Sequence, residues 1–202
     1  MHHYFSRFYA LGLCSCLLYG CTSNNSSTAG NQSASSAPAT NVLTPKGATN
    51  FSSKEANFAI YFPGKVTPSQ SAGSSQWGDY QTFTYSCKAP SVSYVVIATT
   101  IPSGVDTSDP VSFINGVQKG LLKSSGATID RSRELTLNTT PGRELYTTIK
   151  AGGNTGKSRV FIFVTPTISY QIMAVGLDGE FQTSQAQTQI EKVLGSFRLL
   201  AK

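Results

Sequence analysis

Short stretches in which hydrophobic and polar residues alternate recur along the chain after residue 50. Successive side chains of a β-strand point to opposite faces of a sheet, so this alternation indicates strands, and the Gly and Pro residues between the stretches indicate turns. We predict seven strands, at residues 57–62, 79–87, 91–101, 128–137, 143–150, 158–165 and 168–176. The first ends at the turn Pro63-Gly64, and the last two form an antiparallel hairpin around Pro166-Thr167.

Two segments have the helical period instead. Residues 110–123 place apolar side chains on one face, namely Val111, Ile114, Val117 and Leu121. The run Ser108-Asp109-Pro110 supplies an N-cap followed by proline at the first helical position, and the helix is expected to end near Gly126.

A second helix opens with Ser184 and Gln187, which have the spacing of a capping box. It ends at Gly195, and residues 196–200 follow as a short strand or an extended tail. Its apolar face consists of Ala186, Ile190, Val193 and Leu194.

The order of these elements predicts an α+β fold, in which an antiparallel sheet of about six or seven strands has two main helices packed on it. Residues 160–164, Val-Phe-Ile-Phe-Val, are apolar at every position rather than at alternate ones. A strand of this kind is covered on both faces, so we expect it in the interior of the sheet.

The beginning of the chain indicates export and membrane anchoring. Residues 1–20 are typical of a signal peptide, because Arg7 precedes an apolar run that is too short to span a bilayer. The run ends in Leu-Tyr-Gly-Cys at 18–21, which resembles the bacterial lipobox, with tyrosine where a small residue is usual. We therefore predict cleavage before Cys21 and acylation of Cys21. The alternative is an ordinary secretory signal cleaved near Cys14 or Cys16.

Three regions follow from this prediction: a signal peptide at 1–20, the acylated Cys21 with a Ser/Thr/Asn-rich tether at 21–50, and one globular domain at 51–202. Lipidation of this kind adds more than one hydrocarbon chain, which is what stable anchoring requires. We expect the domain to be held at the cell membrane or the outer membrane, facing the periplasm or the exterior.

Cysteine and charge usage narrow the kinds of partner. Cys87 is the only cysteine of the mature domain, so no intrachain disulfide can form. It is either a buried small apolar residue or a partly exposed reactive thiol. The formal net charge is +6, but the basic residues are scattered without a run, which does not favour a nucleic-acid partner.

Several short motifs, in this order along the chain, are similar to those of the PsbP-like domains, the fold of the photosystem II extrinsic protein. They are Phe62-Pro63-Gly64, the helix at 110–123, Pro141-Gly142-Arg143-Glu144, Tyr170-Gln171 and Ser196-Phe197-Arg198-Leu199. The resemblance spans about residues 55–200. It implies an α/β sandwich, and it implies a non-enzymatic accessory or assembly role on an extracytoplasmic membrane. It carries no set of functional residues.

The residue types of the mature chain exclude many catalytic sites. The only histidines are His2 and His3, which leave with the signal peptide. A Ser-His-Asp triad, a Cys-His pair and a histidine-ligated metal are therefore impossible, and one cysteine is too few for a thiolate zinc site. We expect no cofactor and no enzymatic activity.

Three weaker motifs have structural explanations that we favour. Residues 151–158 fit a relaxed phosphate-binding loop, but a predicted strand follows where that mechanism needs a helix, so a glycine-rich hairpin connection is expected. Asp178 and Glu180 read as a turn rather than a calcium site. We expect Asp106 to belong to a turn and Asp109 to cap the helix.

Glu134 and Glu144 are the candidate pair of acids for a carboxylate-based hydrolase.

Trp77 is the candidate partner-binding residue. It lies in the polar segment Ser-Ser-Gln-Trp-Gly-Asp at 74–79, where a tryptophan either anchors a partner or folds over the edge of the core. Three functions remain open: an accessory module that acts through protein contact, a carrier with an apolar pocket for a small ligand, and a hydrolase built on carboxylates.

Overall fold

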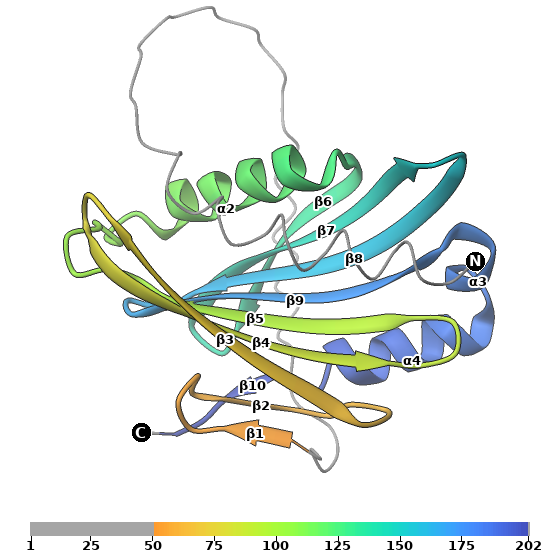
Figure 1. Cartoon of the computed structure of the whole chain (residues 1–202), viewed down its shortest axis with the longest axis horizontal. Helices are drawn as coiled ribbons and strands as arrows, with labels where there is room; N and C mark the ends of the chain where they lie inside the picture. The colour runs from red at the N-terminus through yellow and green to blue at the C-terminus, as the bar shows by residue number, and fades with distance from the viewer. Residues whose placement is uncertain (1–50, 202) are drawn as a thin grey trace, which may run out of the picture.

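The computed structural model describes residues 51–201, and Figure 1 shows their arrangement around one large sheet. The signal peptide at 1–20, Cys21 and the tether at 21–50 lie outside the described residues. The strands are β1 (Phe51–Ser53), β2 (Phe58–Ile60), β3 (Val66–Ser75), β4 (Gly78–Lys88), β5 (Ser93–Thr100), β6 (Thr128–Leu137), β7 (Thr140–Ala151), β8 (Asn154–Val164), β9 (Ile168–Leu177) and β10 (Arg198–Leu199). The helices are α2 (Pro110–Ser125), α3 (Asp178–Phe181) and α4 (Ser184–Leu194).

Seven strands form the large sheet in the order β3-β4-β5-β9-β8-β7-β6, and every neighbouring pair is antiparallel. A second, three-stranded sheet has the order β1-β2-β10. The predicted α+β class is confirmed. The stretch predicted at 57–62 is shorter than expected and belongs to the small sheet as β2.

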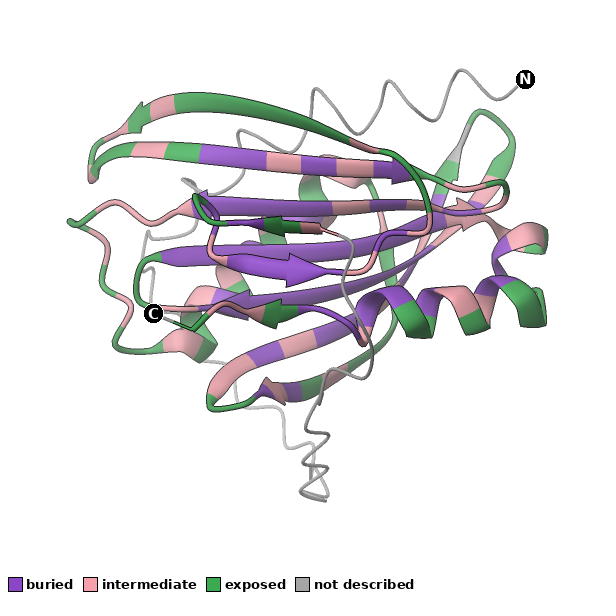
Figure 2. Cartoon of the chain, turned by 90° about the horizontal axis from the view of Figure 1, so that it is seen from below, coloured by how far each residue is buried: buried purple, intermediate pink, exposed green. Residues whose placement is uncertain are grey.

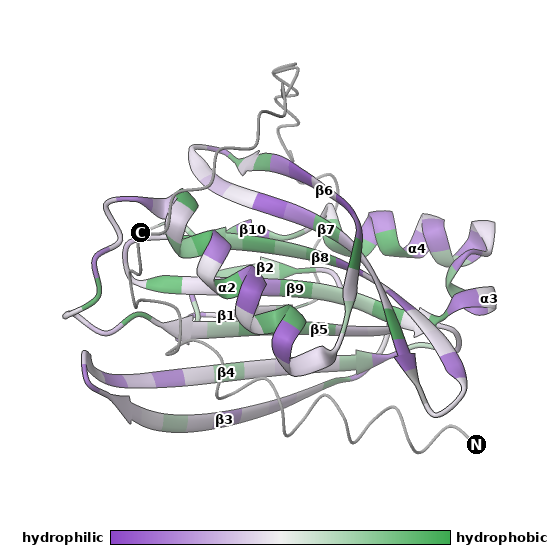
Figure 3. Cartoon of the chain, turned by 90° about the horizontal axis from the view of Figure 1, so that it is seen from above, coloured by the Kyte–Doolittle hydropathy of each residue, from purple (hydrophilic) through white to green (hydrophobic). Residues whose placement is uncertain are grey.

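The large sheet separates two hydrophobic cores, one on each face. On one face α2 covers residues of β7, β8 and β9, and Figure 3 shows the helix lying across these strands. On the other face α4 and the small sheet enclose the larger core, as Figure 2 shows. Aromatic rings fill that core: Phe197 is stacked on Phe163 at a centroid distance of 5.8 Å and on Phe58 at 5.6 Å.

The interior position of the all-apolar strand is confirmed. β8 lies between β9 and β7, and Val160 to Val164 are buried without exception. Each face of this strand contacts a hydrophobic core, so both faces need apolar side chains. This explains why hydrophobic and polar residues do not alternate along it.

The structure confirms the bounds and caps predicted for the first helix. Asp109 Oδ1 accepts hydrogen bonds from the N–H groups of Val111 and Ser112 at 3.1 and 3.0 Å, and Pro110 is the first helical residue. Gly126 follows the last turn with φ of 63°, a conformation that suits glycine. Val111, which was expected on the buried face of the helix, is instead 47% exposed.

The prediction of a capping box at the second helix is wrong. Thr183, one residue earlier than expected, is the N-cap and accepts from the Ala186 N–H at 3.2 Å. The Gln187 side chain donates to the Phe181 carbonyl at 2.6 Å and so does not reach back to a cap residue. The predicted apolar face and the end at Gly195 are confirmed.

Two strands have no counterpart in the prediction. β1 supplies the outer strand of the small sheet, and β3 is a ten-residue strand in a segment without hydrophobic alternation. No helix within residues 51–201 has the length and apolar character needed to cross a membrane.

Candidate functional site

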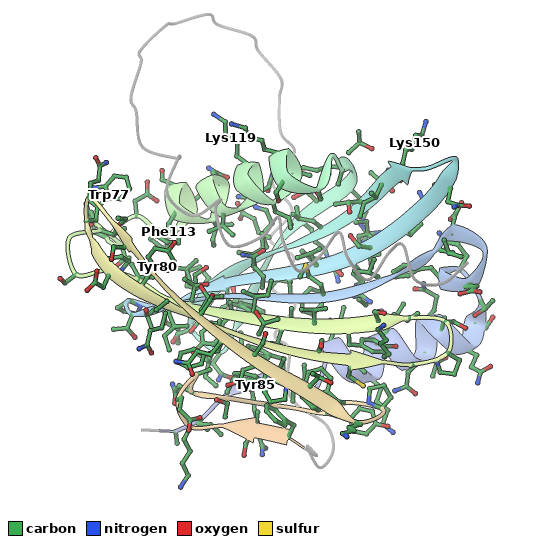
Figure 4. The ribbon with its side chains drawn as sticks, in the orientation of Figure 1. Trp77, Tyr80, Tyr85, Phe113, Lys119 and Lys150 are labelled. Atoms are coloured by element: carbon green, nitrogen blue, oxygen red, sulfur yellow. The ribbon has the colours of Figure 1, made fainter. Side chains whose placement is uncertain are left out.

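Trp77 lies at the tip of the β3–β4 hairpin, at one end of the sheet (Figure 4). The hairpin closes through a two-residue loop, Gln76 and Trp77, between the paired residues Ser75 and Gly78. The Trp77 N–H donates to Ser75 Oγ at 3.2 Å, and the Gly104 N–H donates to the Trp77 carbonyl at 3.3 Å. These hydrogen bonds fix the tip to the loop that precedes α2. The half-buried Trp77 side chain therefore belongs to a turn whose backbone is held in place.

β3 is an edge strand that is exposed along most of its length, as Figure 2 shows. No residue from 66 to 78 carries a charge. The opposite edge strand, β6, has four charged residues and a bulge next to Asp130, two features that discourage pairing with a further strand. Pro68 is the only such protective residue within β3. The two edges of the sheet are therefore protected to very different degrees.

The pairing of β4 with β5 determines which backbone N–H and C=O groups of β3 point away from the sheet. In an antiparallel sheet the hydrogen-bonding groups of successive residues point alternately to the two sides of the strand. The Gln81 N–H points toward β5, where it donates to Thr100 Oγ1 at 2.7 Å, so the N–H groups of Tyr80 and Thr82 point toward β3. Their partners on β3 are Gly73 and Ser71, which are thus turned inward.

The remaining positions of β3 face away from the sheet. By the same alternation the backbone groups of Gln70, Ala72 and Ser74 point outward, and Pro68, which has no N–H to donate, falls on the outward side as well. The outer edge of β3 therefore offers three N–H donors at alternate residues. We call Gln70, Ala72 and Ser74 the open edge.

A hollow of about 500 Å³ lies beside the open edge. Its lining is Ala72, Gly73, Ser74, Asp79, Tyr80, Gln81 and Thr100. A Cβ atom on Gly73 would come within 2.4 Å of the Tyr80 hydroxyl, so glycine lets the tyrosine lie across β3. Ser74 Oγ donates to Asp79 Oδ1 at 2.6 Å. Polar and apolar surface line this hollow in nearly equal parts, and it lies mainly on the hairpin rather than between sheet and helices, where a carrier pocket was expected.

A cluster of charged and aromatic side chains occupies the α4 side of β6, β7 and β8. We call this set the charged cluster: Asp130, Arg131, Arg133, Glu144, Tyr146, Lys157, Arg159 and Glu191. Cross-strand register brings Arg131, Tyr146 and Arg159 into one row, and Arg133 and Glu144 into the next.

Glu144 is the centre of this cluster. Its carboxylate is fully buried and accepts from Arg133 Nε and, at 2.5 Å, from Arg159 Nε. Arg159 is only 3% exposed and also bonds Glu191 of α4 at 2.5 Å. Burial lowers the pKa of Arg159, but the bonds to Glu191 and Glu144 outweigh burial and raise it above its ordinary value. These ion pairs connect the edge of the sheet to α4.

Tyr146 lies between two guanidinium groups. The Arg131 Cζ is 4.9 Å from the centre of its ring and the Arg159 Cζ is 5.2 Å from it, distances typical of cation–π contacts. Burial is the main cause that raises the pKa of Tyr146. Nearby, Lys157 Nζ bonds Asp130 at 3.0 Å, and a hydrogen bond from Thr148 is the main cause that lowers the pKa of Asp130.

Sequence reasoning missed this cluster, although a signal exists. Charged or aromatic residues recur at a spacing of two on three predicted strands: Arg131 and Arg133, Glu144 and Tyr146, Lys157 and Arg159. Residues two apart share one face of a strand, so this spacing indicates a polar face on neighbouring strands.

The candidate carboxylate pair of a hydrolase does not come together. Arg133 and Glu144 are register partners, so Glu134 lies on the opposite face of the sheet from Glu144 and pairs in register with Arg143. Two acids on opposite faces cannot flank one substrate bond.

The other weak motifs have structural roles. Residues 151–158 form the β7–β8 hairpin, with Gly152 and Gly153 at positive φ, as expected from the strand that follows. Asp178 and Glu180 belong to the one-turn helix α3 instead of a plain turn. Within residues 51–201 no three His, Cys, Asp or Glu side chains are grouped closely enough to hold a metal ion. Cys87 is buried as one alternative predicted, and burial raises the pKa of its thiol.

Polar side chains are also buried on the α2 face of the sheet. The hydroxyls of Thr82 and Thr99 lie 3.2 Å apart on β4 and β5. Ser169 Oγ and Gln171 Oε1 of β9 are buried and have no protein partner within the described residues. Such groups normally bond a partner or an ordered water.

No protein-family model matches this sequence, and no curated protein matches it. Among solved structures, the fold is similar to that of the cyanobacterial PsbP protein (CyanoP) from Synechocystis sp. PCC 6803, with 13% sequence identity and a TM-score of 0.53 over 74% of this chain and 90% of that chain. It is also similar to LpqN of Mycobacterium tuberculosis, a protein involved in cell envelope biogenesis, with 14% identity and a TM-score of 0.47 over 69% of this chain and 87% of that chain. The chain therefore has a PsbP-like fold.

Proposed function

We propose that this chain is a lipid-anchored extracytoplasmic accessory module that works through protein contact, and that its partner adds an extended segment along the open edge of β3. The observation that carries the proposal is the row of outward N–H groups at Gln70, Ala72 and Ser74 on an uncharged edge strand. Strand addition uses such groups for affinity, because the partner's backbone completes the hydrogen-bond ladder.

The residue types support a role without catalysis. No histidine follows His3, and Cys87 is buried. The Glu144 carboxylate, the most enclosed acid of the domain, is committed to two arginines. Trp77 at the tip of the same hairpin extends the contact surface, since tryptophan anchors are frequent at the centre of interfaces.

Proline substitution at the open edge tests the proposal. Gln70→Pro removes one outward N–H and leaves the ladder to β4 intact, because position 70 faces away from β4. The matched control is Gln70→Ala, which loses the same side chain and keeps the N–H. We expect affinity capture from solubilised membranes to recover a partner with wild type and Gln70→Ala, and at least tenfold less of it with Gln70→Pro. Equal recovery with both variants would contradict strand addition.

Anchoring is tested separately. In the Cys21→Ser variant no thioether can form at position 21, so we expect the protein to leave the membrane fraction, whereas the wild type stays there and its N-terminal peptide carries the mass of a diacylglyceryl group. A wild-type protein that is recovered free of the membrane, with unmodified Cys21, would overturn the anchoring part of the proposal.

A carrier role for a small, mainly apolar ligand is the second candidate. Ser169 Oγ and Gln171 Oε1 favour it, because a ligand with one polar group between α2 and the sheet would satisfy these buried atoms. Native mass spectrometry of protein purified from its own membrane would detect such a ligand as an added mass, and unloaded protein with an unchanged mass would exclude a tightly bound one.

A further inference from the structure

A second hollow, of about 250 Å³, lies next to the charged cluster. Its charged lining residues are Asp130, Arg131 and Lys157, all from the strands, and Gln182 and Gln187 line it from the segment at α3 and α4. It is smaller than the pockets that hold drug-sized molecules, which begin at about 300 Å³. Its size suits one small group.

Arg131 differs from the other basic residues of the cluster. Arg133 and Arg159 are bound to Glu144, and Lys157 is bound to Asp130. Arg131 forms no ion pair with any carboxylate within residues 51–201, and its guanidinium lies over the Tyr146 ring at 4.9 Å. A contact with the ring does not use the N–H groups of the guanidinium, so an anion can accept hydrogen bonds from them.

Arg131 is exposed, and its contact with the Tyr146 ring orients its guanidinium. Tyr146 is confined by the second guanidinium, that of Arg159, which Glu144 and Glu191 hold in turn. The bulge between Ile129 and Arg131 sets the strand register at this point. A side chain that is already ordered loses little conformational entropy on binding.

The charged cluster has a net positive charge that an anion can balance. Arg131, Arg133, Lys157 and Arg159 give four positive charges, and Asp130, Glu144 and Glu191 give three negative ones, so the sum is +1. Asp130 is bonded to Lys157 and Thr148, which neutralises Lys157 and makes Arg131 the principal cation for a ligand.

The residues with donor groups come from two parts of the fold. Arg131 and Lys157 line the hollow from the strands, whereas Gln182 and Gln187 line it from the other side, that of α3 and α4, where one N–H of the Gln187 amide is already donated to the Phe181 carbonyl. A carboxylate has two oxygens in one plane, and a single arginine satisfies both. A tetrahedral phosphate offers further oxygens that can meet donors on the other side. We propose that this hollow binds a phosphate group, presented either by a lipid head group or by a soluble phosphate ester.

The test uses the full chain with Cys21→Ser, labelled with ¹⁵N and titrated with glycerol phosphate at constant ionic strength. We expect saturable shifts at the amides of Arg131, Tyr146, Lys157 and Gln182. Arg131→Gln should weaken binding about tenfold or more, because a charge-assisted hydrogen bond is lost. The control Lys119→Gln removes the same charge from the exposed side of α2, on the other face of the sheet (Figure 4), and should leave binding unchanged.

Further arms identify the source of the phosphate and guard against a folding defect. Flotation with phosphatidylglycerol vesicles that depends on Arg131 assigns the site to lipid head groups, and a response to glycerol phosphate alone assigns it to soluble esters. If Arg131→Gln does not fold, Arg131→Lys keeps the charge and should still weaken binding, since it lacks the planar fork. Shifts of equal size with acetate, no saturable shift with either probe, or equal binding by the Arg131 variants would overturn the proposal.

Discussion

At the scale of single residues, Glu144 shows how side-chain position depends on strand register. From the sequence it is one of two candidate acids, with Glu134 as its companion, because both occur in neighbouring predicted strands. Register places Glu144 inside the protein between two arginines and Glu134 on the exposed opposite face. A shift of one residue would exchange these faces, and no pattern within either strand specifies the register.

Glu144→Gln should lower the free energy of unfolding by about 3–5 kcal/mol, because it removes the buried carboxylate that pairs with both Arg159 and Arg133. Urea unfolding followed by circular dichroism measures the change. Glu134→Gln is the matched control and should change stability by less than about 0.5 kcal/mol, as expected of an exposed site. Similar losses in the two variants would show that Glu144 does not hold the buried network together.

At the scale of elements, helices were easier to predict than edge strands. The helical period and caps of α2 are local, so residues 110–126 suffice to define it. Apart from Val66 and Thr67, β3 consists of Pro, Ser, Gln, Ala and Gly, none of which is enriched in strands, and neither of its faces is buried enough to require alternation. Its strand conformation comes from ten register pairs with β4, which no local pattern reveals.

Two glycine substitutions test helix propensity in α2 and the packing of β7 against β8 separately. Gly116 lies inside α2 with open space around its Cβ position, so Gly116→Ala should stabilise the protein by about 0.5–1 kcal/mol. At Gly142 of β7 a Cβ would lie 2.6 Å from the Ile162 carbonyl oxygen, so Gly142→Ala should destabilise it by about 1–3 kcal/mol. Thermal unfolding of both variants gives the two signs, and equal signs would contradict the packing described for β7 and β8.

The cap of α2 gives a pH-dependent contribution. Hydrogen bonds from Ser112 are the main cause that lowers the pKa of Asp109 in the folded protein. A carboxyl group with a depressed folded pKa stabilises the fold above its unfolded pKa of about 3.9, and this contribution is lost as the pH falls through the folded value.

Asp109→Asn keeps a side-chain oxygen that can cap the helix but removes the charge. The other acidic residues are the same in both proteins, so their titration affects both stabilities alike. We expect the wild type to unfold at a higher temperature than Asp109→Asn at pH 7, and the difference to disappear at pH 2. A difference that stays constant over this range would show that the charge of Asp109 contributes nothing.

At the scale of the whole molecule, the sequence predicted the fold class and the packing of helices on a sheet. It did not predict the small sheet that covers the larger core. The small sheet joins β1 and β2 from the start of the described region to β10 at its end, through contacts that span more than 130 residues. Phe197 reaches Phe163 and Phe58 in this way. Residues so distant in sequence share no periodic signal, so only the folded chain shows that they meet.

At the same scale, the exposed edges of the large sheet differ in how well they are protected against a further strand. The small sheet and helices cover the central strands, β6 is protected by charge and a bulge, and β3 alone keeps a long neutral edge among the strands of residues 51–201. Amide hydrogen exchange of the protein, free and in complex with its captured partner, tests this edge most directly. We expect the amides of Gln70, Ala72 and Ser74 to exchange rapidly in the free protein and to become protected at these alternate positions in the complex. Protection confined to other segments, with these three amides still exchanging rapidly in the complex, would contradict strand addition at β3.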